Sequence, residues 1–129
     1  MAHESGEEDP VIALGNALSL VRKAIATAEK GLLLNPSTEE QRELNETLVE
    51  LELKKAKIRA QLDAQIAAST TIAGPTAAQV AEISSLTAEV ETLTNASNTA
   101  SAAVALSSRV LALATEVASA SQDPGKPKG

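Results

Sequence analysis

Apolar side chains recur every third or fourth residue through the first third of the chain, a spacing that places them on one face of an α-helix. One row comprises Val11, Leu14, Leu18, Val21, Ile25, Ala28 and Leu32, and the row beside it comprises Ala13, Ala17, Leu20 and Ala24. Asp9 followed by Pro10 indicates where this helix starts, because aspartate caps free N–H groups and a proline in the first turn loses no hydrogen bond. Gly31 is expected to end it as a left-handed C-terminal cap, before Pro36 prevents continuation.

A second helix is predicted to follow Pro36. It starts at a capping box, in which the Ser37 hydroxyl accepts a hydrogen bond from the N–H of Glu40 and the Glu40 side chain reaches back to the serine N–H. Its first apolar row comprises Leu44, Leu48, Leu51, Ile58 and Leu62. A second row is expected to make the apolar surface wide enough for contact with two neighbouring helices, and it comprises Val49, Leu53, Ala56, Ala60 and Ala64.

The segment 76–121 contains no glycine or proline. Thr76 and Gln79 form another capping box at its start. One heptad frame of apolar and small residues runs through it, comprising Ile83, Leu86, Val90, Leu93, Ser97, Ala100, Val104, Ser107, Leu111, Ala114 and Ala118. A turn inside the segment would be expected to shift this frame, so its continuity favours a single long helix. The leading prediction is therefore an all-α fold, an antiparallel helical bundle or coiled coil of three long helices.

The centre of this segment also carries the signs of a break. Thr94, Asn95, Ser97, Asn98 and Thr99 form helix poorly because their side chains compete for backbone hydrogen bonds, and Asn98 is suited to cap a new helix. If the helix breaks near residues 94–99, the alternative is an up-down four-helix bundle. In both cases residues 10–121 form one helical domain, between a disordered acidic tail at 1–9 and a disordered tail at 122–129.

The amino-acid composition argues against most functional classes. The 129 residues include no Phe, Tyr, Trp or Cys and a single histidine, and the net charge is −6. Without aromatic rings or an excess of positive charge, nucleic acid is not an expected partner. Without cysteine there are no disulfides and no thiolate chemistry, and His3 alone cannot complete a catalytic triad or a di-iron site. We therefore expect no enzymatic activity, no cofactor, no bound metal and no small-molecule substrate.

Small residues dominate the segment 93–108, which reads LTNASNTASAAVALSS. In a helix they let another backbone approach closely. The three-helix prediction also leaves apolar residues uncovered, because a second helix of about thirty residues reaches along the third only to about residue 108. This candidate interaction patch comprises Val110, Leu111, Leu113 and Val117, and in the four-helix alternative the same residues fold back into the core.

The predicted function is that of a non-enzymatic helical interaction or scaffold protein, which presents an aliphatic helix face to a protein partner or to a second copy of itself. In being rich in Ala, Ser, Thr and Val and free of Cys, the chain resembles secreted appendage and translocator components of bacteria and chemoreceptor-type coiled coils. No motif assigns it to a family, and an accessory chaperone or an immunity-type binder fits equally well.

Cellular location is predicted from the absence of targeting signals. The opening MAHESGEEDP has no apolar run of the kind found in signal peptides, and the most apolar segment contains Arg109 and Glu116, so no membrane span is expected. A cytoplasmic protein is predicted, with export that uses no signal peptide left open. The alternative function is binding to a membrane surface through the first helix, which combines a wide apolar face with Arg22, Lys23 and Lys30.

Overall fold

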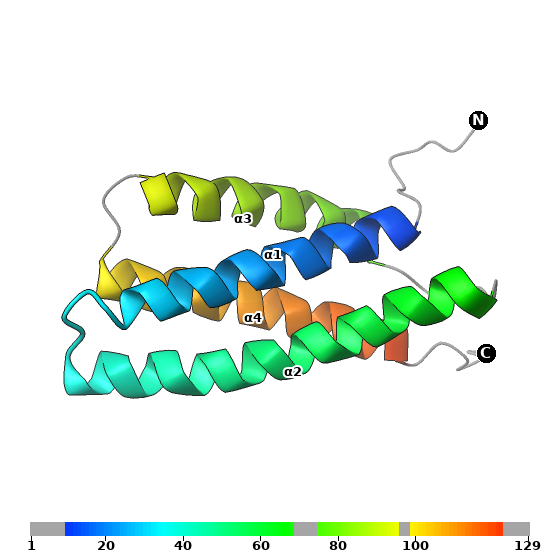
Figure 1. The fold of residues 1–129 in the computed structure, drawn as a ribbon. Helices are drawn as coiled ribbons and strands as arrows, with labels where there is room; N and C mark the ends of the chain where they lie inside the picture. Colours follow the sequence, from blue (N-terminus) through cyan, green and yellow to red (C-terminus); the bar gives the residue numbers. More distant parts are fainter. Residues whose placement is uncertain (1–9, 69–74, 96–98, 123–129) are drawn as a thin grey trace.

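In the described part of the chain, four α-helices run alternately up and down (Figure 1). The computed structural model describes residues 10–68, 75–95 and 99–122. The helices are α1 (Pro10–Gly31), α2 (Thr38–Ala68), α3 (Ala77–Asn95) and α4 (Ala100–Gln122). α1 and α4 contact each other and both remaining helices, whereas no described residue of α2 contacts α3. The bundle therefore has α1 and α4 at its centre, with α2 and α3 on opposite sides.

The prediction of three long helices is wrong, because the segment expected to form one continuous helix contains two. α3 ends at Asn95 and α4 begins at Ala100. Thr99 caps the new helix, since its Oγ1 accepts a hydrogen bond from the N–H of Ala102 at 3.0 Å. Asn98, the cap suggested by the sequence, lies outside the described residues. The chain therefore breaks where the cap-forming side chains lie, and the bundle has the four-helix arrangement of the alternative.

The frame failed as a guide because it does not mark the centre of the buried face of α4. The buried row that holds the larger side chains lies one position earlier in the sequence and comprises Ala103, Leu106, Val110, Leu113 and Val117. Val104 and Leu111, which belong to the frame, are only half-buried. Ser107 and Ala114 are buried beside the larger row and are small enough to fit either face. The phase does shift between α3 and α4, and small residues conceal the shift.

Both predicted capping boxes are confirmed. Ser37 Oγ accepts a hydrogen bond from the N–H of Glu40 at 3.1 Å, and the Glu40 carboxylate accepts one from the N–H of Ser37 at 2.9 Å. Thr76 and Gln79 make the same two bonds before α3, at 3.1 and 3.0 Å. Pro10 is the first residue of α1, as expected, while the predicted cap residue before it lies outside the described residues. Local side-chain chemistry therefore sets where α2 and α3 begin.

Replacing Ser37 with alanine is expected to lower the free energy of unfolding by about 1 kcal/mol. The substitution removes the acceptor for the N–H of Glu40, which is then left to water. Chemical denaturation followed by circular dichroism measures the change. The matched control is Thr38→Ala, because Thr38 is exposed, is next in the sequence and makes neither bond of the box. Equal losses in the two variants would contradict the capping role.

Gly31 does not form the predicted left-handed cap. It is the last residue of α1 and its φ is not in the left-handed region, whereas Asn35, in the turn that follows, has a φ of 54°. Gly31 is buried where α1 meets α4, and a Cβ built on it would lie 2.6 Å from the Cβ of Ala103 and 3.3 Å from Cδ1 of Leu44. Glycine is required here by the close approach of two helices and not by the conformation of the turn.

Both apolar rows of α1 contribute to the core, which confirms the wide face predicted for this helix. Leu14 and Leu20 are 0% and 1% exposed. They belong to one cluster of buried side chains that includes Ile58 of α2, Leu86 of α3 and Val110 of α4. The apolar face of α1 is therefore the surface on which the other three helices assemble.

α2 packs against α1 and α4 mainly through its first apolar row, in which Leu44, Leu51 and Ile58 are fully buried. The expectation that its second row takes part in these contacts is wrong. That row lies on the opposite side of the helix, where Val49 is 60% exposed and Leu53 is 51% exposed. We call this exposed row the α2 stripe, and it comprises Val49, Leu53, Ala56, Ala60 and Ala64.

Candidate functional site

The predicted interaction patch lies inside the bundle. Val110, Leu113 and Val117 are 0%, 4% and 1% exposed, and Leu111 is half-buried against the same core. The patch was predicted on the assumption that a long third helix extends beyond the end of the second. Because α4 instead lies alongside α1 and α2, the overhang does not exist. These four residues are core side chains in this fold and not a free surface.

The small residues of the segment 93–108 do permit close packing, as expected. Ala103 is fully buried and faces Gly31 of α1, where the two helices approach each other closely. Ala100 and Ser107, one turn to either side, are buried as well. The Ser107 hydroxyl donates to the carbonyl of Ala103 at 2.6 Å, so it is satisfied within its own helix. These residues are therefore structural.

The interior offers little for catalysis. Among the described residues, the buried polar side chains are Thr27, Thr47, Gln61 and Ser107, and none of them is ionisable. Gln61 Nε2 donates to the carbonyl of Ala118 at 2.8 Å and so links α2 to α4, while its Oε1 has no partner in the described part of the chain. An activated nucleophile needs a general base beside it, and no ionisable group is buried among these side chains.

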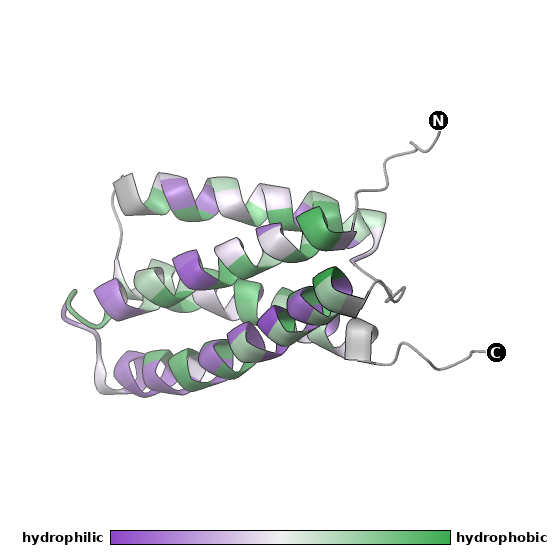
Figure 2. Ribbon diagram, turned by 45° about the vertical axis from the view of Figure 1, so that its right-hand side comes forward, coloured by the Kyte–Doolittle hydropathy of each residue, from purple (hydrophilic) through white to green (hydrophobic). Residues whose placement is uncertain are grey.

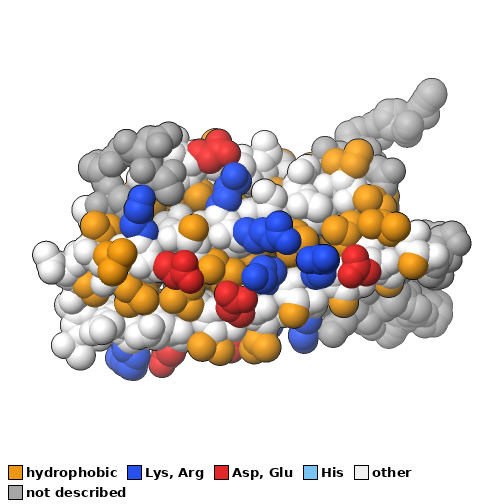
Figure 3. Space-filling model, viewed as in Figure 1, with side chains coloured by type: hydrophobic (Ala, Val, Ile, Leu, Met, Phe, Trp, Pro, Cys, Tyr) orange, Lys and Arg blue, Asp and Glu red, His pale blue; other side chains and the backbone are white. Residues whose placement is uncertain are grey.

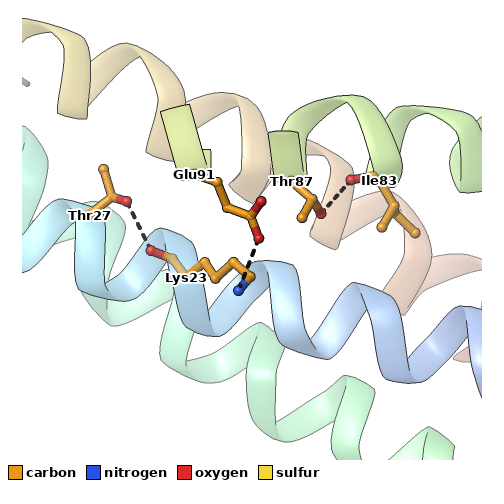
Figure 4. A network of polar contacts seen from close by, with 5 residues as sticks. All are labelled: Lys23, Thr27, Ile83, Thr87 and Glu91. Atoms are coloured by element: carbon orange, nitrogen blue, oxygen red, sulfur yellow. Dashed lines mark hydrogen bonds and ion pairs between the residues drawn. The ribbon is translucent and has the colours of Figure 1, made fainter. Parts of the chain in front are cut away.

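A shallow groove of about 370 Å³ lies between α1 and α3. Its polar lining comprises Asn16, Ser19, Ser84, Thr87 and Glu91. Glu91 extends from α3 towards Lys23 of α1, with 3.5 Å between Oε2 and Nζ, and Thr87 donates to the carbonyl of Ile83 at 2.7 Å (Figure 4). Both charged side chains are more than a third exposed, so their ion pair adds little to stability. Apart from Glu91, whose carboxylate pairs with Lys23, the polar lining of the groove consists of hydroxyl and amide groups.

A second groove, of about 540 Å³, lies between α3 and α4 and is mainly aliphatic. At its rim Arg109 Nη1 and Nη2 donate to the two carboxylate oxygens of Glu89, at 2.8 and 3.2 Å. These hydrogen bonds, and then the charge of Glu89, raise the pKa of Arg109 above its ordinary value, and Glu82 adds to the effect. An arginine with a raised pKa stays protonated, so the pair joins two helices and has no acid–base role.

Charged side chains of α2 form pairs within the helix, and all of these side chains except that of Lys54 are at least a third exposed. Lys55 Nζ lies 3.3 Å from Glu52 Oε1. Lys54 Nζ lies 3.8 Å from Glu50 Oε1, and the Lys54 side chain is 17% exposed. The described residues contain no group of three or more His, Cys, Asp or Glu side chains that could hold a metal ion. His3 lies outside the described residues.

The α2 stripe is the surface that sequence reasoning placed wrongly. Its residues follow one another at spacings of four, three, four and four, which keeps them within about 80° around the helix. Figure 2 shows hydrophobic and hydrophilic residues interleaved along α2, and Figure 3 shows apolar side chains between charged ones along the lower edge of the molecule, where α2 lies. The row was visible in the sequence, but the pattern alone did not tell a row that contacts a neighbour from a row that faces solvent.

By length and composition alone, two helices among the described residues are apolar enough to cross a membrane, in the segments Pro10–Gly31 and Ala100–Ser119. Within the bundle, 56% of an apolar 18-residue stretch of the first segment and 44% of one in the second are buried, because these are the two central helices. The apolar face of α1, on which the membrane-surface alternative depends, is occupied by the core.

Comparison with known protein families, curated proteins and solved structures found no match. Function is therefore inferred from the geometry of this chain alone.

Proposed function

We propose that this chain is a non-enzymatic helical interaction protein, which uses the α2 stripe to bind a protein partner or a second copy of itself. The observation that supports this proposal is the position of the stripe. Val49 and Leu53 lie on the side of α2 opposite to the fully buried Leu51 and Ile58. A helix that only closes the bundle needs one apolar row, and α2 carries two.

Isolated exposed apolar residues are common on protein surfaces, whereas a continuous row is typical of a surface that becomes covered. The stripe is continuous over several turns, because every position that follows its spacing from Val49 to Ala60 holds an apolar residue. Charged residues border it on both sides, including Glu50 and Lys57 on one side and Glu52 on the other. An apolar centre with a charged rim is the usual composition of a protein–protein interface.

The rest of the described surface supports an interaction role better than a catalytic one. Its two grooves contain no buried ionisable group, and most of the paired charged side chains of α2 are exposed to solvent. With no aromatic residue anywhere in the chain, an interface must be built from aliphatic side chains. The α2 stripe, which consists of Val, Leu and Ala, has this composition.

Photo-crosslinking in the cells that make the protein tests the proposal. A photoreactive amino acid is placed at Leu53 in the stripe and, as a matched control, at Ser85, which is exposed on α3. The expected result is one or a few adducts of defined mass from position 53 and none of these from position 85. Equal adducts from both positions, or none from position 53, would contradict a binding role for the stripe.

A further inference from the structure

We propose that the partner of the α2 stripe is a second copy of the chain, and that the two α2 helices pair antiparallel across a two-fold axis between Lys54 and Lys55. This inference rests on the proposed function, because it names the occupant of the same surface. It depends on the spacing of the apolar residues and on the charges beside them.

Antiparallel pairing about this axis matches every apolar residue at the centre of the stripe with another. Val49 of one copy meets Ala60 of the other, and Leu53 meets Ala56, so that large residues face small ones. Two-fold symmetry repeats each contact, which gives a closed interface of two identical patches. The stripe is self-complementary in size as well as in polarity.

The charges beside the stripe fit the same axis. In an antiparallel helix pair, the residues that flank the apolar seam face their equivalents on the same side of the seam. On one side this places Glu50 opposite Lys57 of the second copy, and on the other it places Glu52 opposite Arg59 of the second copy. Symmetry repeats both pairs, so all the charged contacts nearest the axis join opposite charges.

Parallel pairing of the two α2 helices would bring fewer opposite charges together. In a parallel pair each flanking residue meets one five positions away on the partner, so Glu52 meets Lys57 while Arg59 meets Ala64. One type of ion pair then forms instead of two. The present partners of these side chains do not prevent a rearrangement, because they are exposed pairs within the helix, such as Arg59 with Asp63 at 3.7 Å, and such pairs are weak. Lys57 makes no ion pair with another described residue.

Charged residues at the ends of the stripe fix the register. Glu46 and Asp63 are the next residues of the seam on either side of the apolar centre. A shift by one heptad in either direction would bring Asp63 against Leu53 or Glu46 against Ala56, which would desolvate a carboxylate on an apolar surface. In the proposed register these two carboxylates meet each other only at the open ends, where water reaches them.

The rest of the molecule leaves the surface accessible. α2 contacts α1 and α4 with its opposite face, and no described residue of α3 contacts it. Since the apolar centre spans only about three helical turns and includes no aromatic residue, the interface is small and the dimer is expected to be weak, with a Kd in the micromolar range or above. Sedimentation should therefore be measured at chain concentrations from about 10 µM to about 1 mM.

Disulfide trapping tests the orientation of the two helices. The chain contains no cysteine, so substitutions introduce the only thiols. A mixture of Val49→Cys and Ala60→Cys chains should form a covalent heterodimer on mild oxidation, and neither variant should dimerise covalently by itself. In the antiparallel pair two copies of position 49 are about 16 Å apart along the axis, beyond the reach of a disulfide. Covalent dimers of Val49→Cys alone would show parallel pairing and overturn the inference.

Charge exchange tests the contact between Glu52 and Arg59. Arg59→Glu should raise the dimer Kd about tenfold, and mixing it with Glu52→Arg chains should restore association as a heterodimer. Arg22→Glu is the control for net charge, because Arg22 is exposed on α1 and lies outside the stripe, and it should leave the Kd unchanged. Loss of affinity in the control equal to that of Arg59→Glu would overturn the assigned pair.

These measurements separate this inference from the proposed function. A chain that stays monomeric up to about 1 mM and gives no mixed disulfide overturns self-pairing. If position 53 then crosslinks to a different protein in cells, the stripe still binds a partner and the proposed function stands. If position 53 gives no specific adduct either, both proposals fail.

Discussion

Replacing Leu113 with glutamate is expected to remove much of the stability of the protein. Leu113 is 4% exposed and belongs to the central cluster of buried side chains. A carboxylate in that position loses its hydration without gaining a buried ionic partner, which costs about 4 kcal/mol or more. A domain of this size has a total stability of roughly 5–15 kcal/mol, so the loss removes much of it. Circular dichroism and a denaturant titration should show reduced helicity and a lower transition midpoint.

The matched control is Leu53→Glu, which makes the same chemical change on a helix surface. Because Leu53 is 51% exposed on the α2 stripe, helicity should be retained and the free energy of unfolding should change by about 0.5 kcal/mol or less. The pair of variants also separates the two places proposed for an interaction surface. If Leu113→Glu kept full helicity and stability, Leu113 would be a surface residue and the four-helix core described above would be wrong.

The sequence was most informative where a short stretch of chain decides the structure. The capping boxes at Ser37 and Thr76 were predicted with their hydrogen bonds, because each involves side chains only three residues apart. The two rows of α1 were predicted to pack in a bundle because apolar residues at that spacing lie together on one face of a helix. Both inferences needed no knowledge of how the helices are arranged.

The break between α3 and α4 was harder to predict because two local signals disagreed. The heptad frame favoured continuity, whereas Thr94, Asn95 and Thr99 favoured a turn. What decides between them is a long-range effect: folding back buries Val110 and Val117 against α1 and α2, and a continuous helix would leave them in water. Energies of that kind depend on the positions of the other helices, which the pattern does not contain.

The exposure of the α2 stripe also could not be predicted from the spacing of its residues alone. The second apolar row of α2 and the second apolar row of α1 have similar spacing, yet Leu20 of α1 is buried and Leu53 of α2 is exposed. Among the described helices, α1 contacts three others and α2 contacts two. Which row becomes a surface is therefore decided by the place of each helix in the bundle. The candidate surface moved from α4 to α2 for this reason.

Gly31→Ala is expected to lower the free energy of unfolding by about 2 kcal/mol. The added Cβ would lie 2.6 Å from the Cβ of Ala103, a distance that real Cβ atoms do not tolerate, and 3.3 Å from Leu44 Cδ1. The Leu44 side chain can rotate away, but the Ala103 Cβ is attached directly to the backbone of α4. The clash can be relieved only by moving one helix away from the other, which loosens the core contacts on both sides.

Gly15→Ala is the matched control, because it makes the same substitution in the same helix where nothing lies within 4 Å of the added Cβ. There the better helix propensity of alanine should raise stability by about 0.5–1 kcal/mol. Combining Gly31→Ala with Ala103→Gly should cost less than the sum of the two single changes by about 1 kcal/mol, since the second change removes the atom that clashes. Denaturant titrations of the unsubstituted chain, the two single variants and the double variant measure this coupling. If Gly31→Ala stabilised the chain as Gly15→Ala does, α1 and α4 would not approach as closely as described, and the role assigned here to the small residues of α4 would be wrong.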